Sequence, residues 1–320
     1  MADGSTIDST VQSPPQHAHA VLHCNLNTAD LARAQAFYTS AFGLTERMRT
    51  VGVDSDATAM GLGPRTQSVT SFLYDRRGPR VAPAIELVGW TDPAVTARPA
   101  SGTVGLTAIG YRTPALQAVL DRVAADAGQQ ARPVEPVDGG LLVRGQSCPA
   151  ARIVDPDGVT VEIIEIAASA DEDSDPAAGS VISHERITCR DLDRSIDWYT
   201  SIGWQAQARG DGDGSGRWAS LGLPADSSFS IELTEQPSAA GIDWINAATQ
   251  GLYRMALAVE DVNRAHAELV SGGLSGLREP FFFPMPDTPT GGFTALFLHD
   301  PDGVVVELVE RPRSALRRKV

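Results

Sequence analysis

The sequence has few cysteines, few basic residues and no long apolar run, and each shortage excludes a class of protein. Three cysteines in 320 residues, none in a CxxC spacing, exclude a disulfide framework and a zinc ribbon and fit a reducing compartment. The net charge of −14 argues against a nucleic-acid partner, because polyanions bind basic surfaces. No run of about 18 apolar residues predicts a membrane span, and the N-terminus lacks the pattern of a secretory signal. We therefore predict a cytoplasmic protein.

Three segments have compositions typical of chain outside a folded core. Residues 1–19 are small, polar and proline-containing, and they predict a disordered N-terminal tail. Residues 167–180, AASADEDSDPAAGS, predict an acidic linker. Residues 313–320 hold the one basic cluster and predict a frayed C-terminal tail. Two candidate domains remain, 20–166 and 181–312, each of ordinary domain size.

The two candidate domains repeat one pattern. Each begins with an alternating strand that contains a histidine, followed after seven residues by an aspartate and an apolar helical stripe. Asp30 and Asp191 are suitable N-cap residues for that helix, because their side chains can accept hydrogen bonds from free N–H groups of the first turn. The matching segments are VLHCNLNTADLARAQAFYTSAFGL (21–44) and ISHERITCRDLDRSIDWYTSIGW (182–204).

A second strand and helix follow in each domain, at residues 105–128 and 251–273, so each domain holds two strand–helix–strands units. The second unit ends in a turn and a strand, VDPDGVTVEI (154–163) and HDPDGVVVEL (299–308). Proline and glycine suit this turn, because proline fixes φ and glycine accepts a positive φ. The last strand of every unit carries a glutamate; the four are Glu86, Glu162, Glu232 and Glu307.

An insertion distinguishes the first domain from the second. Asp30 and Asp191 are 161 positions apart, whereas Glu86 and Glu232 are only 146 apart. The first domain therefore has about fourteen extra residues, which fall between Gly43 and Glu86 in a glycine-rich stretch that predicts a loop. Two interpretations stay open, a lid or binding loop over a cavity and an ordinary surface excursion.

The order of these pieces, repeated twice, resembles the vicinal oxygen chelate superfamily, the group of glyoxalase I, bleomycin-resistance proteins and extradiol dioxygenases. The resemblance covers residues 20–166 and 181–311. It implies an α+β fold of two tandem domains, each of paired βαβββ modules that form a cup-shaped mixed β-sheet with outer helices. Some members pair modules crosswise, the first with the fourth and the second with the third, and the sequence leaves this choice open.

In metal-binding members of this superfamily, ligands come from the first and the last strand of each module. The resemblance therefore implies a site for divalent Zn, Ni, Mn or Fe, which imidazole and carboxylate ligands suit. Alternation along the strands directs each glutamate into the cup, opposite its apolar neighbours. Glu86 and Glu162 are the favoured catalytic residues. The candidate metal ligands are His23, Glu86, Glu162, His184, Glu232 and Glu307.

Two modules depart from this ligand pattern. Ala108 and Arg254 stand where the first strand of the second and the fourth module would offer a ligand. Ala108 only vacates a position, whereas the guanidinium of Arg254 competes with a metal for the carboxylates of the same cup. This contrast places Glu86 and Glu162 ahead of Glu232 and Glu307 as functional residues.

Two functions from different classes stay open. The first is a metal-dependent lyase or isomerase of the glyoxalase type, in which the metal stabilises an enediolate-like anion and a glutamate moves the proton. The second is a metal-free cup that resembles the bleomycin-resistance type and sequesters a small molecule or assists a biosynthesis. Arg254, Phe281 and Phe283 are candidate ligand contacts, although the phenylalanines also suit a strand core.

An extradiol dioxygenase fits less well, because each cup offers a single histidine of the ligand type and such enzymes use two histidines and one carboxylate. The expected partner is a small-molecule substrate or ligand, with no nucleic acid and no membrane. Since the tandem chain already supplies four modules, the protein is expected to be a monomer or a homodimer.

Overall fold

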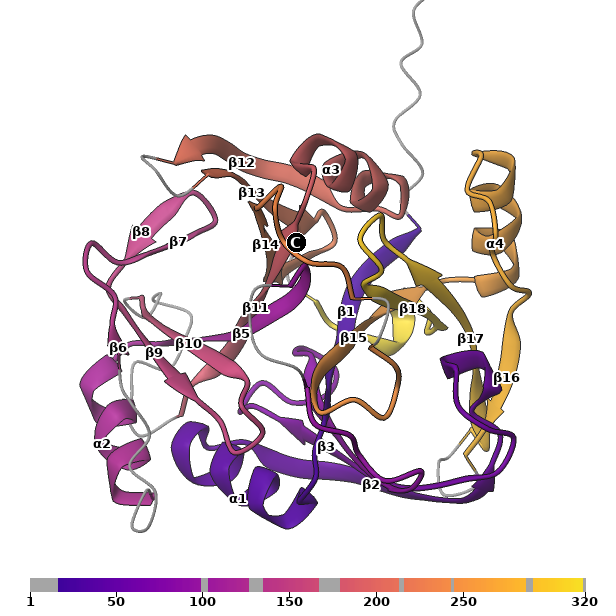
Figure 1. The fold of residues 1–320 in the computed structure, drawn as a ribbon, viewed down its shortest axis with the longest axis horizontal. Helices are drawn as coiled ribbons and strands as arrows, with labels where there is room; N and C mark the ends of the chain where they lie inside the picture. Colours follow the sequence, from indigo (N-terminus) through magenta and orange to yellow (C-terminus); the bar gives the residue numbers. More distant parts are fainter. Residues whose placement is uncertain are drawn as a thin grey trace, which may run out of the picture.

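The computed structural model describes residues 17–98, 103–126, 135–166, 179–212, 216–242, 245–285 and 290–318. Four βαβββ modules follow one another along the chain (Figure 1). The predictions for residues 1–16 and 167–178 lie outside the described residues. None of the helices in the described part of the chain is long and apolar enough to cross a membrane.

The first half of the chain forms modules 1 and 2. Module 1 consists of β1 (Ala18–Asn27), α1 (Leu31–Phe42), β2 (Thr45–Ser55), the 3-10 helix η1 (Thr58–Met60), β3 (Thr66–Tyr74) and β4 (Ala84–Asp92). Module 2 consists of β5 (Gly105–Thr113), α2 (Leu116–Asp126), β6 (Glu135–Pro136), the hairpin β7 (Leu141–Val143) and β8 (Gln146–Cys148), β9 (Ala150–Val154) and β10 (Thr160–Glu165).

The second half forms modules 3 and 4. Module 3 consists of β11 (Val181–Cys189), α3 (Leu192–Ser201), β12 (Gln205–Gly212), β13 (Gly216–Leu223) and β14 (Asp226–Glu235). Module 4 consists of β15 (Gly251–Val259), α4 (Val262–Ser271), β16 (Phe281–Pro284), β17 (Gly292–His299) and β18 (Val305–Glu310), and the 3-10 helix η3 (Arg313–Ala315) follows it.

The modules pair across the two halves of the chain. One eight-stranded sheet has the order β16-β17-β18-β15-β1-β4-β3-β2 and joins modules 1 and 4; we call it cup 1. The other has the order β12-β13-β14-β11-β5-β10-β9-β6 and joins modules 2 and 3; we call it cup 2. In Figure 1 the indigo strands of module 1 accordingly lie beside the orange and yellow strands of module 4. The predicted α+β class with two cup-shaped sheets is confirmed, and each half contributes one module to each cup.

The helices begin where the sequence predicts. The carboxylates of Asp30 and Asp191 each accept a hydrogen bond of 3.0 Å from the backbone N–H three residues later, so both are N-caps. The helices and the outer faces of both sheets share one large apolar core. Burial of this shared core holds the two cups together.

The two DPDG turns connect neighbouring modules of the same half. Asp155 accepts a hydrogen bond of 2.8 Å from the hydroxyl of Tyr38 on α1, and Asp300 accepts one of 3.1 Å from Tyr199 on α3. The other carboxylate oxygen of each aspartate accepts backbone N–H groups within its own turn. Burial raises the pKa of both aspartates to about 6. In each repeated turn the first aspartate therefore stabilises the turn with one carboxylate oxygen and holds the helix of the preceding module with the other.

Both chain ends are more ordered than predicted. β1 begins at Ala18, within the segment predicted as tail, and the side chain of His19 is buried. The prediction of a frayed end from residue 313 is wrong through Arg318. The buried guanidinium of Arg318 lies 3.3 Å from the carboxylate of Asp226 and donates to the backbone oxygen of Val21. A buried charge with a partner of opposite sign fixes the segment in place.

Candidate functional site

The sheet register identifies four equivalent positions. In every module one residue of the first strand pairs with the residue two positions before the glutamate of the last strand. These residues are His23, Ala108, His184 and Arg254, as the sequence predicts. Cup 1 therefore combines His23 and Glu86 with Arg254 and Glu307, and cup 2 combines His184 and Glu232 with Ala108 and Glu162.

In cup 1 the guanidinium of Arg254 lies between two glutamates. Its Nη2 donates to both carboxylate oxygens of Glu86, at 3.1 and 2.8 Å, and its Nε donates to Oε2 of Glu307 at 2.8 Å. Burial would lower the pKa of Arg254, but the two carboxylates outweigh burial and raise it. All three side chains are buried, so the cluster is a desolvated ion network with one cation and two anions.

His23 and Asn25 complete this cluster. Nε2 of His23 lies 3.3 Å from Oε2 of Glu86 and 3.6 Å from Oε2 of Glu307, and the Asn25 amide donates to the same Glu86 oxygen at 3.0 Å. Burial would raise the pKa of Glu307, but the Arg254 guanidinium and the His23 imidazole outweigh it and lower that pKa to about 2. The carboxylates of Glu86 and Glu307 are thus both occupied by contacts with Arg254, His23 or Asn25.

A β-bulge explains how two adjacent residues of β15 reach this face. Cys24 pairs with Met255 and Leu26 pairs with Leu252, so Tyr253 and Arg254 together lie opposite one residue of β1. In such a bulge the alternation of side chains is interrupted. Both side chains then contact η1, since the Tyr253 hydroxyl donates to the Met60 backbone oxygen at 3.4 Å and Nη1 of Arg254 lies 3.9 Å from the Met60 sulfur.

In cup 2 a different arginine engages the buried glutamate. Arg186 donates from Nε and Nη2 to Glu162 over 2.9 to 3.1 Å, and Arg152 adds bonds of 3.0 and 3.2 Å. His184 places Nε2 3.0 Å from the same carboxylate. Burial would raise the pKa of Glu162, but the bonds from His184 and Arg186 outweigh burial and lower it. The position that Ala108 vacates is therefore compensated by an arginine two residues after His184.

Glu232 has separate partners in cup 2. Its carboxylate accepts from the hydroxyls of Ser220 and Ser230 and, at 3.2 Å, from the backbone N–H of Arg144 in the β7–β8 hairpin. No bond joins it to His184 or Glu162 among the described residues. Of the six predicted metal ligands, the structure thus brings together His23, Glu86 and Glu307 in one cluster and His184 and Glu162 in another.

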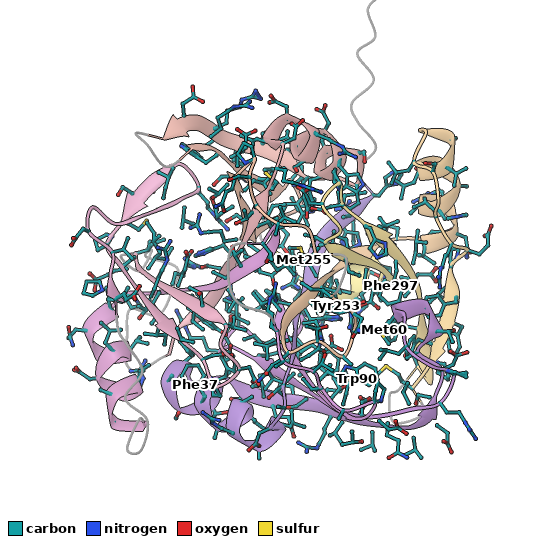
Figure 2. All side chains as sticks on the ribbon, in the orientation of Figure 1. Phe37, Met60, Trp90, Tyr253, Met255 and Phe297 are labelled. Atoms are coloured by element: carbon teal, nitrogen blue, oxygen red, sulfur yellow. The ribbon has the colours of Figure 1, made fainter. Side chains whose placement is uncertain are left out.

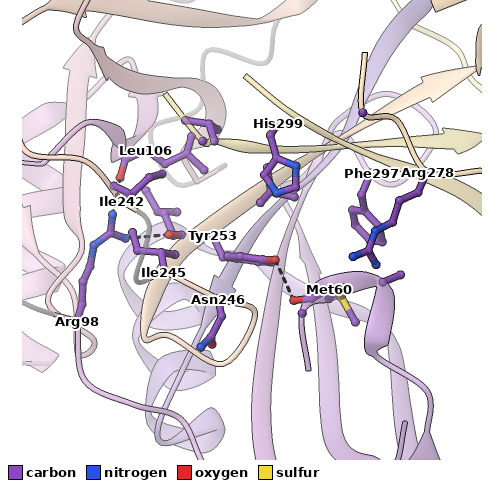
Figure 3. A pocket seen from close by; sticks show the side chains of 17 residues that line it. Met60, Arg98, Leu106, Ile242, Ile245, Asn246, Tyr253, Arg278, Phe297 and His299 are labelled. Atoms are coloured by element: carbon purple, nitrogen blue, oxygen red, sulfur yellow. Dashed lines mark hydrogen bonds between the residues drawn. The ribbon is translucent and has the colours of Figure 1, made fainter. Parts of the chain in front are cut away.

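A cavity of about 360 Å³ lies beside the strands of module 4 in cup 1 (Figure 3). Phe297 in its wall pairs with Glu307 across the sheet, so the cavity is on the same face as the ion cluster. Tyr253, Phe297 and Val305 of its wall come from the strands of module 4. Met60 also lines it, and because Met60 contacts Arg254, this side chain lies between the cavity and the cluster. Figure 2 shows Met60, Trp90, Tyr253 and Phe297 in the same region, where they form one buried apolar cluster. The insertion of the first domain therefore builds part of the cavity wall.

The predicted aromatic contacts lie beside the cavity. Phe281 stacks on Phe297 with ring centroids 5.6 Å apart, and Phe283 stacks on Phe293 at 5.7 Å. Neither Phe281 nor Phe283 is among the residues that line the cavity, and Arg254 lies behind Met60. The phenylalanines thus support the wall from outside, and their role as ligand contacts stays a prediction.

The comparisons with known proteins agree with this architecture. The sequence matches the Glyoxalase/Bleomycin resistance protein/Dioxygenase superfamily over residues 20–163 and 181–308. The chain belongs to this superfamily. Its fold is similar to glyoxalase I from Zea mays, with 20% identity, a TM-score of 0.66 and 92% of each chain covered. It is also similar to a candidate dioxygenase from Bacillus subtilis, with 14% identity, a TM-score of 0.64, and 92% of this chain and 86% of that one covered. No curated protein matches the sequence significantly.

Membership of the superfamily raises the question of a metal, and the residues of cup 1 can be tested for fit. A divalent ion would share the oxygens of Glu86 and Glu307 with the buried guanidinium of Arg254, and two close cations repel strongly in a desolvated site. Within the described ranges, no group of three or more His, Cys, Asp or Glu side chains is arranged to hold a metal ion. In this arrangement the carboxylates of cup 1 bind a guanidinium in the place where a metal would need them. The six metal-ligand assignments stay predictions.

Several residues of the site were not identified from the sequence. Arg186 follows His184 by two positions, so strand alternation places both on one face, and the sequence was sufficient to predict Arg186 in cup 2. Met60 and Tyr253 depend on the fold of an insertion and on a bulge, which no local pattern announces. Arg98, which also lines the cavity, lies in a loop outside any repeated motif.

Proposed function

We propose that this protein binds a small, largely apolar molecule in cup 1 without a metal. The observation that carries the proposal is the Arg254 guanidinium, which bonds to both glutamates of the cup from the position of the missing fourth ligand. A bidentate arginine matches carboxylate geometry and stays charged at every physiological pH. The cluster then serves as a rigid support behind Met60, which lines the cavity.

The cavity supports a binding role. Its volume of about 360 Å³ lies within the range of small-molecule sites, about 300–1,000 Å³. Its wall combines aromatic and aliphatic side chains with polar ones, among them Arg98, Asn246 and Arg278, and such a combination is typical of small-molecule sites. Sequestration of a small molecule, or assistance in a biosynthesis, is the role that this combination favours. A cytoplasmic location and a monomeric or homodimeric state stay predictions.

The first test measures metal binding. Purified protein is titrated with Zn²⁺, Ni²⁺, Mn²⁺ and Fe²⁺, and bound metal and thermal stability are recorded. We expect less than stoichiometric metal and no rise in Tm for the natural sequence. The matched variant Arg254→His supplies a second imidazole in place of the guanidinium, so it should gain metal-dependent stability, by about 2.7 kcal/mol at a metal concentration 100-fold above Kd.

The opposite result would support the metal-dependent lyase or isomerase. The close approach of three potential ligands favours this second candidate, because Nε2 of His23 lies 3.3 Å from the carboxylate of Glu86 and 3.6 Å from that of Glu307. One tightly bound metal per natural chain, lost in His23→Ala and Glu86→Ala, would show that Arg254 moves aside and that the metal-free proposal is wrong.

The second test measures binding to the cavity with a neutral apolar probe, N-phenyl-1-naphthylamine, whose fluorescence rises in apolar surroundings. We expect one site per chain, unaffected by EDTA. Ile245→Trp should fill the cavity and abolish the signal, because Ile245 lines it. Val270→Trp on α4 is the control, because Val270 is 50% exposed to solvent and does not line the cavity. Equal probe binding by both variants would refute the cavity as the binding site.

A further inference from the structure

The cavity of cup 1 contains a half-buried cation, Arg98, that has no counter-ion among the described residues. Burial lowers the pKa of Arg98, and no carboxylate of the described residues lies within 4.0 Å of its guanidinium. Two of its five N–H groups donate to backbone oxygens, Nη1 to Leu252 at 2.8 Å and Nη2 to Leu106 at 3.3 Å. Burying an unpaired charge is costly, so buried charges in proteins normally have a partner of opposite sign. Arg98 therefore has no partner of opposite charge among the described residues.

Arg278 gives the cavity wall a second positive charge. Arg278 and His299 also line the cavity, and none of its 17 described lining residues is Asp or Glu. This composition contrasts with the protein as a whole, whose net charge is −14. Burial, followed by the nearby Arg278, lowers the pKa of His299, so His299 is a neutral hydrogen-bonding group here. The cavity is a locally cationic site in an acidic protein.

The cationic groups lie around an apolar middle. In Figure 3, Arg98 and Arg278 lie on opposite sides of Tyr253, and Leu106, Ile242 and Ile245 gather beside Arg98. An anionic group next to Arg98 would therefore continue into an apolar body that contacts these side chains. A free inorganic anion would leave the apolar wall without a partner.

We infer that the cavity of cup 1 is the site of a small amphipathic anion, a carboxylate or a phosphate attached to an apolar body, and that Arg98 binds its charged group. This inference rests on the proposed binding function and specifies the class of ligand. The guanidinium offers three N–H groups beyond those bonded to Leu252 and Leu106, which suits the two or three oxygens of such a group.

The position of Arg98 adds a structural consequence. Leu106 belongs to β5 of cup 2 and Leu252 to β15 of cup 1, so the guanidinium bridges the first strands of two modules from different cups. The preceding Thr96 forms a β-bridge with Thr249 at the entry to module 4. An anion bound by Arg98 would thus lie at the junction of the two cups. These same bonds also offer a purely structural role for Arg98, which the experiment must separate.

The experiment displaces N-phenyl-1-naphthylamine from the full-length protein with four matched competitors: octanoate, octyl phosphate, octan-1-ol and octylamine. We expect both anions to bind about 10- to 100-fold more tightly than the alcohol, because hydrogen bonds to charged groups are the strong ones. The amine should bind most weakly. The ratio of octanoate to octyl phosphate assigns the charged group.

Three variants locate the effect. Arg98→Gln should lose the preference for anions but keep the binding of octan-1-ol, whereas Arg98→Lys, which keeps the charge, should retain most of the preference. Arg209→Gln, which removes the same charge from the exposed β12 strand of cup 2, is the control and should change nothing. A structural role alone would lower Tm and weaken all four competitors equally.

The outcomes distinguish this inference from the proposed function. Equal binding of octan-1-ol and octanoate by the natural protein would overturn the inference while the apolar site stands. Absence of binding by every competitor and by the probe would overturn the binding function itself. If Arg98→Gln does not fold, the salt dependence of the natural protein decides, because only binding of an anion to a cationic site weakens as ionic strength rises.

Discussion

The buried side chain of Glu185 offers a sharp test of the fold. Glu185 follows His184 on β11, and alternation turns it away from cup 2 into the shared core, where it is fully buried beside the Cys24 thiol. No basic side chain pairs with it among the described residues. Burial, only partly opposed by Cys24, raises its pKa to about 8 from a normal 4.5. The folded protein therefore keeps this carboxyl protonated at neutral pH.

The magnitude follows from linkage between proton binding and folding. Between pH 4.5 and 8 the folded state holds a proton on Glu185 that the unfolded state has lost. The free energy of unfolding therefore falls by about 1.4 kcal/mol per pH unit in this window, or about 5 kcal/mol in all. The stability is fully present below pH 4.5 and is lost as the pH rises to about 8. Glu185→Gln cannot ionise and does not share this loss.

The assay is urea unfolding of the natural protein and Glu185→Gln at pH 5, 6, 7 and 8, followed by tryptophan fluorescence. We expect the variant to gain about 2–3 kcal/mol relative to the natural protein between pH 5 and 7. The comparison cancels the titration of Asp155 and Asp300, whose pKa values near 6 are common to both proteins. Glu279→Gln, at an exposed site, is the control. Parallel pH profiles for the natural protein and Glu185→Gln would refute the reasoning.

Three further predictions concern the cups and turns. Gly110→Ala should cost about 2 kcal/mol or more and lower Tm, because the new Cβ would overlap the His184 imidazole. Gly63→Ala should not, because its Cβ would meet only the Arg65 backbone nitrogen, at an ordinary contact distance of 4.0 Å. Arg254→Met should cost about 3–5 kcal/mol in urea unfolding, since Glu86 and Glu307 stay buried without their cation; an unchanged midpoint would contradict the ion network. Tyr38→Phe should lower unfolding free energy by about 1.5–3 kcal/mol above pH 6, where Asp155 is ionised, and less at pH 5.

The repeated pattern was sufficient to predict the modules. Asp30 and Asp191 cap their helices as expected, because a cap depends on a few neighbouring residues. The partners of β1 and β5 could not be predicted, since the same alternating strands satisfy pairing within a half or across halves. The choice depends on the shared core and the links between modules, which are tertiary features.

The same distinction applies to the site. The co-location of Arg254 with Glu307 was expected from the repeat, because both belong to module 4, and the structure confirms their bond. The approach of Arg254 to Glu86 required crosswise pairing. Arg98 could not be predicted from the sequence, because the role inferred for it depends on the cavity around it and on the absence of a described carboxylate nearby.

The DPDG turns affect how the four modules are held together. Sheets join modules 1 with 4 and 2 with 3, while Tyr38–Asp155 joins modules 1 and 2 and Tyr199–Asp300 joins modules 3 and 4. The sheets and turns thus join the four modules in a closed ring, in which each module is linked to two others. If the chain were cut between modules 2 and 3, both sheets and both tyrosine–aspartate hydrogen bonds could still form. Two separately expressed halves should therefore be insoluble or unstable alone but reassemble when mixed, as the pieces of a split protein do.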